Sequence, residues 1–248
     1  MIDHKLPKGW KDLQHKVAEI FSDIGCKTET DKKIQTVRGT VNVDVFSTDE
    51  SQSPSIVYLC ECKHWEKRIP KTIVHSFRTV VQDFGANFGI IISKKGFQKG
   101  AYEAAKNTNI KLVGWFDFQD MFEEKWLPAI SQKVYNECET FIDYTEPIIT
   151  TFIAKKFEQL GEDRNRIQKF QKLRKKYMTI GFLIVALRFG NSFVDIKQKF
   201  PLVLEAPSEE QNESKRTKLR SLREYVDYLV LWAKEGLREF NELFGESV

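Results

Sequence analysis

Two short apolar segments, separated by one amphipathic segment, constrain the fold of this chain more than any other feature. Residues 55–60, SIVYLC, and residues 89–93, GIIIS, have the length and composition of strands rather than helices. The second segment has no alternation of polar and apolar residues, as in a strand of a sheet that is covered on both faces. Residues 70–84, between them, have helical spacing and begin with a proline. This order predicts an α/β layer structure.

The neighbouring segments extend the same pattern over residues 1–130. Residues 9–25 have an apolar stripe with helical spacing, and residues 33–48 alternate between apolar and polar side chains. The other expected elements are strands at 56–65 and 110–115 and helices at 100–108 and 117–130. We therefore expect an α/β domain over 1–130, with a mixed sheet flanked by helices.

The pattern changes near residue 140, where the strand signals end and helical spacing takes over. We expect residues 131–248 to form a mainly α-helical domain that serves DNA binding or dimerisation. Residues 207–214 are polar and acidic and predict a surface loop. Residues 215–245 predict one long helix with apolar residues near heptad a and d positions. This stripe either packs on its own domain or forms a dimer seam.

The composition is that of an ordinary soluble protein. The chain has 248 residues, of which 41% are hydrophobic and 30% charged, and its net charge is +4. DNA contact would therefore depend on local patches of basic residues. The longest apolar stretch, residues 180–187, is too short to cross a membrane. Four cysteines do not make a disulfide scaffold, and we expect a cytoplasmic protein with reduced thiols.

The segment CECK, residues 60–63, places a carboxylate and an ammonium on one face at the end of an apolar strand. Alternate side chains of a strand share a face, so Glu61 and Lys63 point the same way. Asp44, on the preceding strand, comes beside Glu61 if the two strands form a hairpin. Two carboxylates at neighbouring strand ends suit Mg²⁺, which polarises a phosphate while a nearby lysine orients water. The alternative is a surface salt bridge between Glu61 and Lys63.

Three segments together resemble a known family. RGTVNVDV, CECKHW and FRTVVQDFGANFGIIISKKGFQKGAYEAAK are similar to the PD-(D/E)xK nuclease superfamily, and within it to the Mrr-like restriction endonuclease domain. The resemblance covers roughly residues 9–122. It implies a restriction-endonuclease-like sheet, DNA as substrate, and phosphodiester hydrolysis with Mg²⁺ or Mn²⁺. It also implies that Asp44 is the catalytic aspartate and that Glu61 and Lys63 are the (D/E)xK pair. The backbone carbonyl of Cys62 is a further expected ligand of the metal.

One position of the first helix departs from the family pattern. The family often has a glutamate there, near the metal, and this chain has Gln14. At 100° per residue, Gln14 lies at the rim of the apolar stripe, whereas Glu19 faces away from it. We therefore expect Gln14 on the metal side and Glu19 in solvent. Because a neutral amide binds Mg²⁺ less strongly than a carboxylate, weaker metal binding or inactivity is an open alternative.

Cysteine and histidine side chains alternate on the other face of the same strand. Cys60, Cys62 and His64 suggest zinc, but same-face neighbours on a strand are about 7 Å apart, too far for three to share one ion. We interpret the two cysteines as buried strand residues.

Two basic segments are candidates for contact with the DNA backbone. Residues 93–101, SKKGFQKGA, join a strand to a helix, and helix starts favour phosphate. Residues 164–176 carry seven Lys or Arg and no acid, opposite an apolar stripe. A solvated surface is the alternative for both. The residues expected to contact nucleic acid are Lys94, Lys95, Gln98, Lys99, Lys172, Arg174, Lys175 and Lys176.

The sequence thus favours a Mg²⁺-dependent DNA endonuclease in restriction or phage defence. A structure-specific or repair nuclease would share its chemistry. The alternative class is a nuclease-fold module that binds DNA or a protein partner without cutting. A homodimer is expected because one active site cuts one strand, and a defence system leaves room for a protein partner.

Overall fold

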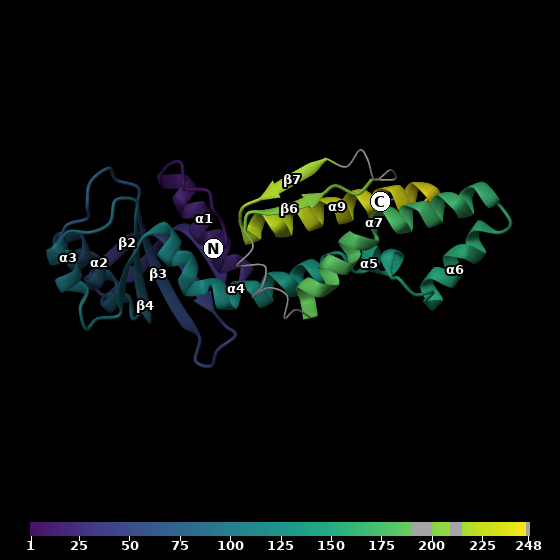
Figure 1. Cartoon of the computed structure of the whole chain (residues 1–248). Helices are drawn as coiled ribbons and strands as arrows, with labels where there is room; N and C mark the ends of the chain where they lie inside the picture. The colour runs from purple at the N-terminus through teal and green to yellow at the C-terminus, as the bar shows by residue number, and fades with distance from the viewer. Residues whose placement is uncertain (190–199, 209–214, 247–248) are drawn as a thin grey trace. The chain divides into compact units, whose positions relative to one another are not determined.

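The computed structural model describes residues 1–189, 200–208 and 215–246 (Figure 1). The chain divides into two compact units, whose boundary falls inside helix α4 (Trp115–Glu137). Residues 5–129, together with Met1, form the first unit. Residues 130–248, together with residues 2–4, form the second.

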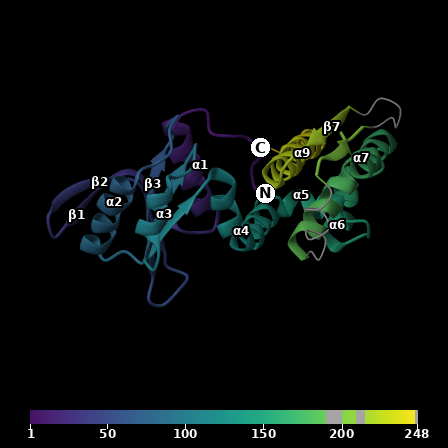
Figure 2. The ribbon, with the colours of Figure 1, turned by 60° about the vertical axis from the view of Figure 1, so that its left-hand side comes forward.

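The first unit is built on a five-stranded sheet with the order β1-β2-β3-β4-β5. Its strands are β1 (Lys27–Thr36), β2 (Gly39–Asp49), β3 (Ile56–Lys63), β4 (Phe88–Ser93) and β5 (Ile110–Val113). The pairs β1–β2 and β2–β3 are antiparallel, whereas β3–β4 and β4–β5 are parallel. The sheet is therefore mixed, as the sequence predicts, and its first two strands form a long hairpin (Figure 2).

Helices lie against this sheet. They are α1 (Trp10–Asp23), α2 (Lys71–Phe84), α3 (Lys99–Ala105) and the first part of α4. Phe21 of α1 and Phe122 of α4 both contact Tyr58 of β3, with ring centroids 5.2 and 5.8 Å from that of the tyrosine. Leu59, the next residue of β3, instead belongs to the cluster that contains Phe77 of α2. Alternation along β3 thus gives the sheet two apolar faces, with different helices on each.

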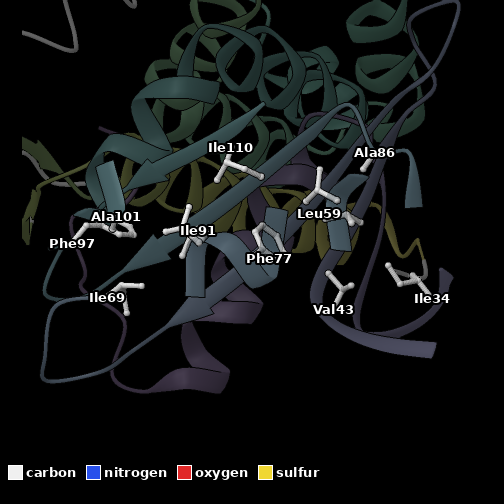
Figure 3. Close-up of a cluster of buried hydrophobic side chains, with 12 residues drawn as sticks. Ile34, Val43, Leu59, Ile69, Phe77, Ala86, Ile91, Phe97, Ala101 and Ile110 are labelled. Carbon is white, nitrogen blue, oxygen red and sulfur yellow. The ribbon is translucent and has the colours of Figure 1, made fainter. Parts of the chain in front are cut away.

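The cluster beneath α2 forms the core on one side of the sheet (Figure 3). β4 contacts α2 closely because Gly89 has no side chain. A Cβ at this position would lie 2.6 Å from both Val81 Cγ2 and Ile110 Cδ1. The labelled members of the cluster are Ile34, Val43, Leu59, Ile69, Phe77, Ala86, Ile91, Phe97, Ala101 and Ile110.

The second unit is mainly helical. It contains α5 (Glu139–Thr145), α6 (Thr151–Leu160), α7 (Arg164–Phe189) and α9 (Leu222–Phe244). The apolar stripe of α9, including Val226, Leu229 and Phe240, is buried within this unit, where α9 contacts α5 and α7. Of the two interpretations of this stripe, packing on its own domain holds, and the stripe is not free to form a dimer seam.

Two expectations about the elements were wrong in detail, and a third is not tested. The hairpin β1–β2 occupies residues 27–49, where one alternating segment at 33–48 was expected, because Gly39 has a φ of 123° and allows the chain to turn. The segment 215–245 is not one helix, since β7 (Arg216–Leu219) precedes α9 and pairs with β6 (Leu202–Glu205). The expected loop at 207–214 lies mostly outside the described residues.

No helix in the described residues is both long and apolar enough to span a membrane.

Candidate active site

Asp44 is tied to β3 at the point where β2 and β3 diverge. The two strands pair from Asp49 to Val45, and Val45 lies opposite Cys60. One more step in this register brings Asp44 opposite Glu61. The Cys62 backbone N–H donates a hydrogen bond of 2.6 Å to Asp44 Oδ2. The hairpin expected from the sequence thus brings the two carboxylates to neighbouring positions.

Glu61 and Lys63 form an ion pair on one side of β3. Their side chains are 22% and 16% exposed, so the pair is mostly buried but still open to solvent. Lys63 Nζ also lies 5.5 Å from the centroid of the Trp65 ring. The ammonium is therefore held between a carboxylate and an aromatic ring, and it keeps a path to bound water or substrate.

The electrostatics at Glu61 oppose its ionised form. Burial raises the pKa of Glu61, and the nearby Asp44 carboxylate raises it further. The hydrogen bond and charge of Lys63 act in the opposite direction but do not cancel the shift. A cation placed between Asp44 and Glu61 would relieve their repulsion. The site is thus short of positive charge.

Gln14 of α1 contacts the site through its amide nitrogen. The side chain is buried, with 1% exposure. Its Nε2 donates to Asp44 Oδ1 at 3.0 Å and to Asp31 Oδ1 at 3.2 Å. The position of Gln14 beside Asp44 is that expected from the helix geometry, whereas Glu19 lies on the exposed side of α1.

Asp31 was not expected from the sequence. It lies in β1, in the polar segment TETDKK, and its backbone has a φ of 51°. Asp is one of the few residues other than Gly that adopt this left-handed conformation. The sequence shows only that an aspartate interrupts the polar segment of this strand. It does not show that Asp44 lies opposite.

The donors at the site suit a hard divalent cation. Asp44 and Glu61 supply carboxylate oxygens, which Mg²⁺ prefers, and Mg²⁺ sites usually keep several waters. Within the described ranges, no group of three or more His, Cys, Asp or Glu side chains is arranged to hold a metal. The donor set therefore fits an ion held by two carboxylates, completed by water, substrate or the expected Cys62 carbonyl.

The cysteines of β3 lie in the apolar interior. Cys60 and Cys62 have no exposed surface, and burial raises the pKa of both thiols well above the ordinary value. His64 Nε2 lies 3.0 Å from the Pro7 carbonyl oxygen. Buried thiols that resist deprotonation are poor zinc ligands, which agrees with their interpretation as core residues.

The loop after β4 carries basic side chains close to Lys63. The Lys94 backbone N–H donates to the Lys63 carbonyl at 3.1 Å, so the loop starts beside the site. Lys94 and Lys95 both pair with Glu66, Lys95 at 3.5 Å. Gln98 and Lys99 are exposed at the start of α3. The loop also borders a cavity of about 590 Å³ whose lining includes His64, Ser93, Lys94, Lys95 and Trp115.

The four basic residues of α7 that were expected to contact nucleic acid fall into two groups. Lys172 and Lys175 are exposed and make no ion pair within the described part of the chain. Arg174 donates to the backbone carbonyls of Tyr144 and Glu146. Lys176 pairs with Glu239 of α9 at 2.8 Å. Of these four, Lys172 and Lys175 are therefore the two side chains that can bind a partner without breaking an internal contact.

Comparisons with known proteins give one family match and one similar solved structure. Residues 8–122, slightly less than half of the chain, match the model of a family described as restriction endonuclease. No curated protein matches the chain. One solved structure, described as a protein of unknown function, has 16% sequence identity and a TM-score of 0.40. It covers 69% of this chain and 99% of its own. The match agrees with the resemblance of the three segments: residues 8–122 are similar to the Mrr-like restriction endonuclease domains of the PD-(D/E)xK superfamily.

Proposed function

We propose that this protein is a DNA endonuclease that hydrolyses phosphodiester bonds with Mg²⁺ or Mn²⁺. The observation that carries the proposal is the grouping of Asp44, Glu61 and Lys63 at the end of β3, with Asp44 fixed by the Cys62 amide. Their chemistry, two hard oxygen ligands beside one ammonium, is that required for metal-assisted attack on a phosphate. The match of residues 8–122 to restriction endonucleases supports the same reaction class.

Each residue has a role that follows from its surroundings. Asp44 and Glu61 would hold the ion, with the Cys62 carbonyl as an expected further ligand. The bound ion would polarise the phosphate and lower the pKa of a water molecule. Lys63, which lies beside Glu61, would orient the attacking water and stabilise the charge that develops on the phosphate.

The DNA backbone would lie against the loop after β4. Lys94, Lys95 and Lys99 supply positive charge there. Gln98 is exposed and directly precedes α3. Because Lys94 and Lys95 share Glu66, binding to phosphate would exchange an exposed ion pair for contacts to DNA. Such exposed pairs contribute little stability, so their loss is easily offset. A role in restriction or phage defence is consistent with the family.

The test of the proposed function is cleavage by the purified wild-type protein. Plasmid, methylated and phage DNA are incubated with Mg²⁺, with Mn²⁺ and with EDTA, and products are separated on gels. We expect nicked or linear DNA with either metal and intact DNA with EDTA. Cleavage that continues in EDTA would contradict the metal mechanism, and intact DNA under every condition would contradict the enzymatic function.

The second candidate is a nuclease-fold module that binds DNA or a protein without cutting. It is favoured by Gln14, which brings an uncharged amide to the site. This function predicts retarded migration of DNA in a gel-shift assay, together with no product in the cleavage assay at any metal concentration. The cleavage assay therefore distinguishes the two candidate functions, because only the endonuclease gives cleaved DNA.

A further inference from the structure

The ladder between β1 and β2 is interrupted at a single residue of β1. Residues 27–30 and 32–36 each have a partner on β2, and Asp31 alone has none. Its neighbours Thr30 and Lys32 pair with Val45 and Val43, so the interruption lies opposite Asp44. Asp31 also has the only positive φ in the strand, 51°. The strand therefore departs from regular pairing where an aspartate comes next to the candidate site.

This departure brings Asp31 into a bridge with the site. Gln14 Nε2 donates to Asp31 Oδ1 at 3.2 Å and to Asp44 Oδ1 at 3.0 Å. Because the two bonds share one nitrogen, the two carboxylate oxygens are at most about 6 Å apart. A primary amide has two N–H donors, and both are used here.

We propose that Asp31 is a positioning residue of the metal site, acting through Gln14 and through its charge; this inference rests on the proposed metal-dependent function. Asp31 and Asp44 together fix which way the Gln14 amide faces. Both are carboxylates and accept hydrogen bonds, so turning the amide over would place Oε1 against two acceptors. Gln14 is therefore held as a donor to Asp44 and is not a ligand of the ion.

The role of Asp31 is indirect. No group of three acidic, His or Cys side chains in the described residues is arranged around one point, so Asp31 does not join Asp44 and Glu61 as a third ligand. Its charge still acts on the ion. A carboxylate and a divalent cation that lie several ångströms apart attract each other even at the permittivity of water. The Gln14–Asp31 pair thus gives the site a negative charge that Gln14 alone does not.

The experiment separates charge from structure. Asp31→Asn removes the charge but keeps an acceptor oxygen for Gln14, and Asn tolerates a positive φ as well as Asp does. Binding of Mn²⁺ is measured by isothermal titration calorimetry, without DNA. We expect the Kd of Asp31→Asn to rise about fivefold relative to wild type. The matched control is Glu29→Gln, which removes one exposed charge from the same strand and leaves the Kd unchanged.

A second variant tests whether the two positions form one unit. Gln14→Glu alone places a carboxylate between Asp31 and Asp44, and it should lower the melting temperature of the metal-free protein. The double variant Gln14→Glu/Asp31→Asn restores one negative charge and one neutral side chain, with their positions exchanged. We expect it to recover the wild-type Kd for Mn²⁺ and part of the melting temperature lost in Gln14→Glu. The repulsion between the new carboxylate at position 14 and residue 31 is removed, while that between the new carboxylate and Asp44 remains. Independent effects of the two substitutions would overturn the inference.

The outcomes distinguish this inference from the proposed function. If wild type binds Mn²⁺ and Asp31→Asn binds it with the same Kd, the role of Asp31 is wrong while the metal site stands. If wild type binds no Mn²⁺ at any accessible concentration, both proposals fail together.

Discussion

Asp44 accepts hydrogen bonds from two different elements, the Gln14 side chain of α1 and the Cys62 amide of β3. One carboxylate thus connects the helix to the strand that carries Glu61 and Lys63. Each oxygen of a carboxylate has a second lone pair, so both bonds leave room for a cation. At the scale of single residues, the site is held ready by donors that do not block its chemistry.

The raised pKa of Glu61 predicts how the stability of the metal-free protein depends on pH. A carboxyl whose pKa is higher in the folded than in the unfolded state favours folding when protonated. Its contribution is present at low pH and is lost as the pH rises through the folded-state pKa. Melting temperatures in EDTA should therefore decline more steeply for wild type than for Glu61→Gln as the pH rises from the ordinary glutamate pKa.

Subtracting the curve of melting temperature against pH for Glu61→Gln from that for wild type leaves the contribution of Glu61. Other carboxyls, such as Asp49, whose pKa is lowered by Ser51 and Lys125, contribute equally to both curves. Parallel curves for wild type and Glu61→Gln would mean that Glu61 titrates normally and that the electrostatic strain at the site is absent.

The sequence indicates some of these residues and not others, for a physical reason. Glu61 and Lys63 are two apart on a strand, and the period of a strand alone puts them on one face. The proximity of Asp44 requires only that two consecutive strands form a hairpin. Asp31 depends on an irregularity in β1 and on the amide of a distant helix, and neither leaves a periodic signal.

At the scale of elements, the position of β4 depends on one small residue. A Cβ on Gly89 would lie 2.6 Å from Val81 Cγ2 and Ile110 Cδ1 and 3.0 Å from Phe77 Cε1. Gly89→Ala should therefore destabilise the protein by about 1–3 kcal/mol, as overpacked cores do. The measurement is urea unfolding followed by circular dichroism.

Gly100→Ala is the matched control. Gly100 lies in α3, and the nearest atom to a Cβ there would be Lys71 Cδ at 3.5 Å, an ordinary contact. The same substitution should stabilise the protein by about 0.5–1 kcal/mol, because Ala is the better helix former. The close approach of β4 and α2 would be contradicted if Gly89→Ala changed the free energy of unfolding less than Gly100→Ala did. It would also be contradicted if both substitutions changed that free energy in the same direction.

The exposure and contacts of the basic side chains of α7 indicate which of them are available to bind DNA. Lys172 and Lys175 are exposed, whereas Arg174 and Lys176 hold the second unit together. Lys172→Gln/Lys175→Gln should reduce the slope of log affinity against log salt by about 0.9 for each phosphate that the protein no longer neutralises. Binding is measured by fluorescence anisotropy at several salt concentrations.

The control removes two exposed lysines elsewhere in the second unit, Lys155→Gln/Lys218→Gln, and should leave the slope unchanged. Equal slopes for both double variants and wild type would reassign α7 to solubility or to a protein partner. Arg174→Gln is unsuitable for this test, because it would leave two backbone carbonyls without their donor.

The family match covers most of the first unit of the molecule and none of the helical second unit. Residues 8–122 match restriction endonucleases, and the second unit begins at Ile130. The helical content of the second unit follows from its 3.6-residue periodicity. Its β6–β7 hairpin was missed because each strand has only four residues. Such short strands are stabilised by their neighbours more than by their own sequence.

A homodimer stays a prediction. Because the apolar stripe of α9 is buried, such a dimer would have to form through a different surface. Two active sites are needed to cut both strands at once, so a dimer is expected from the proposed chemistry. Light scattering on the full chain, alone and with DNA, should give twice the monomer mass in at least one state. A monomer in both states would limit the proposed nuclease to nicking one strand at a time.

The most direct test of metal-dependent DNA cleavage at this site is the cleavage rate of Lys63→Ala. Its matched control is Lys67→Ala, because Lys67 also lies beside the Trp65 ring, at 5.6 Å, but is exposed and has no ion pair with Glu61. Both variants are first shown to be folded by circular dichroism. Lys63→Ala should slow cleavage by about 10²-fold or more, while Lys67→Ala should cut at the wild-type rate. Wild-type cleavage by a folded Lys63→Ala protein would contradict cleavage at this site and leave CECK as a strand end with a salt bridge.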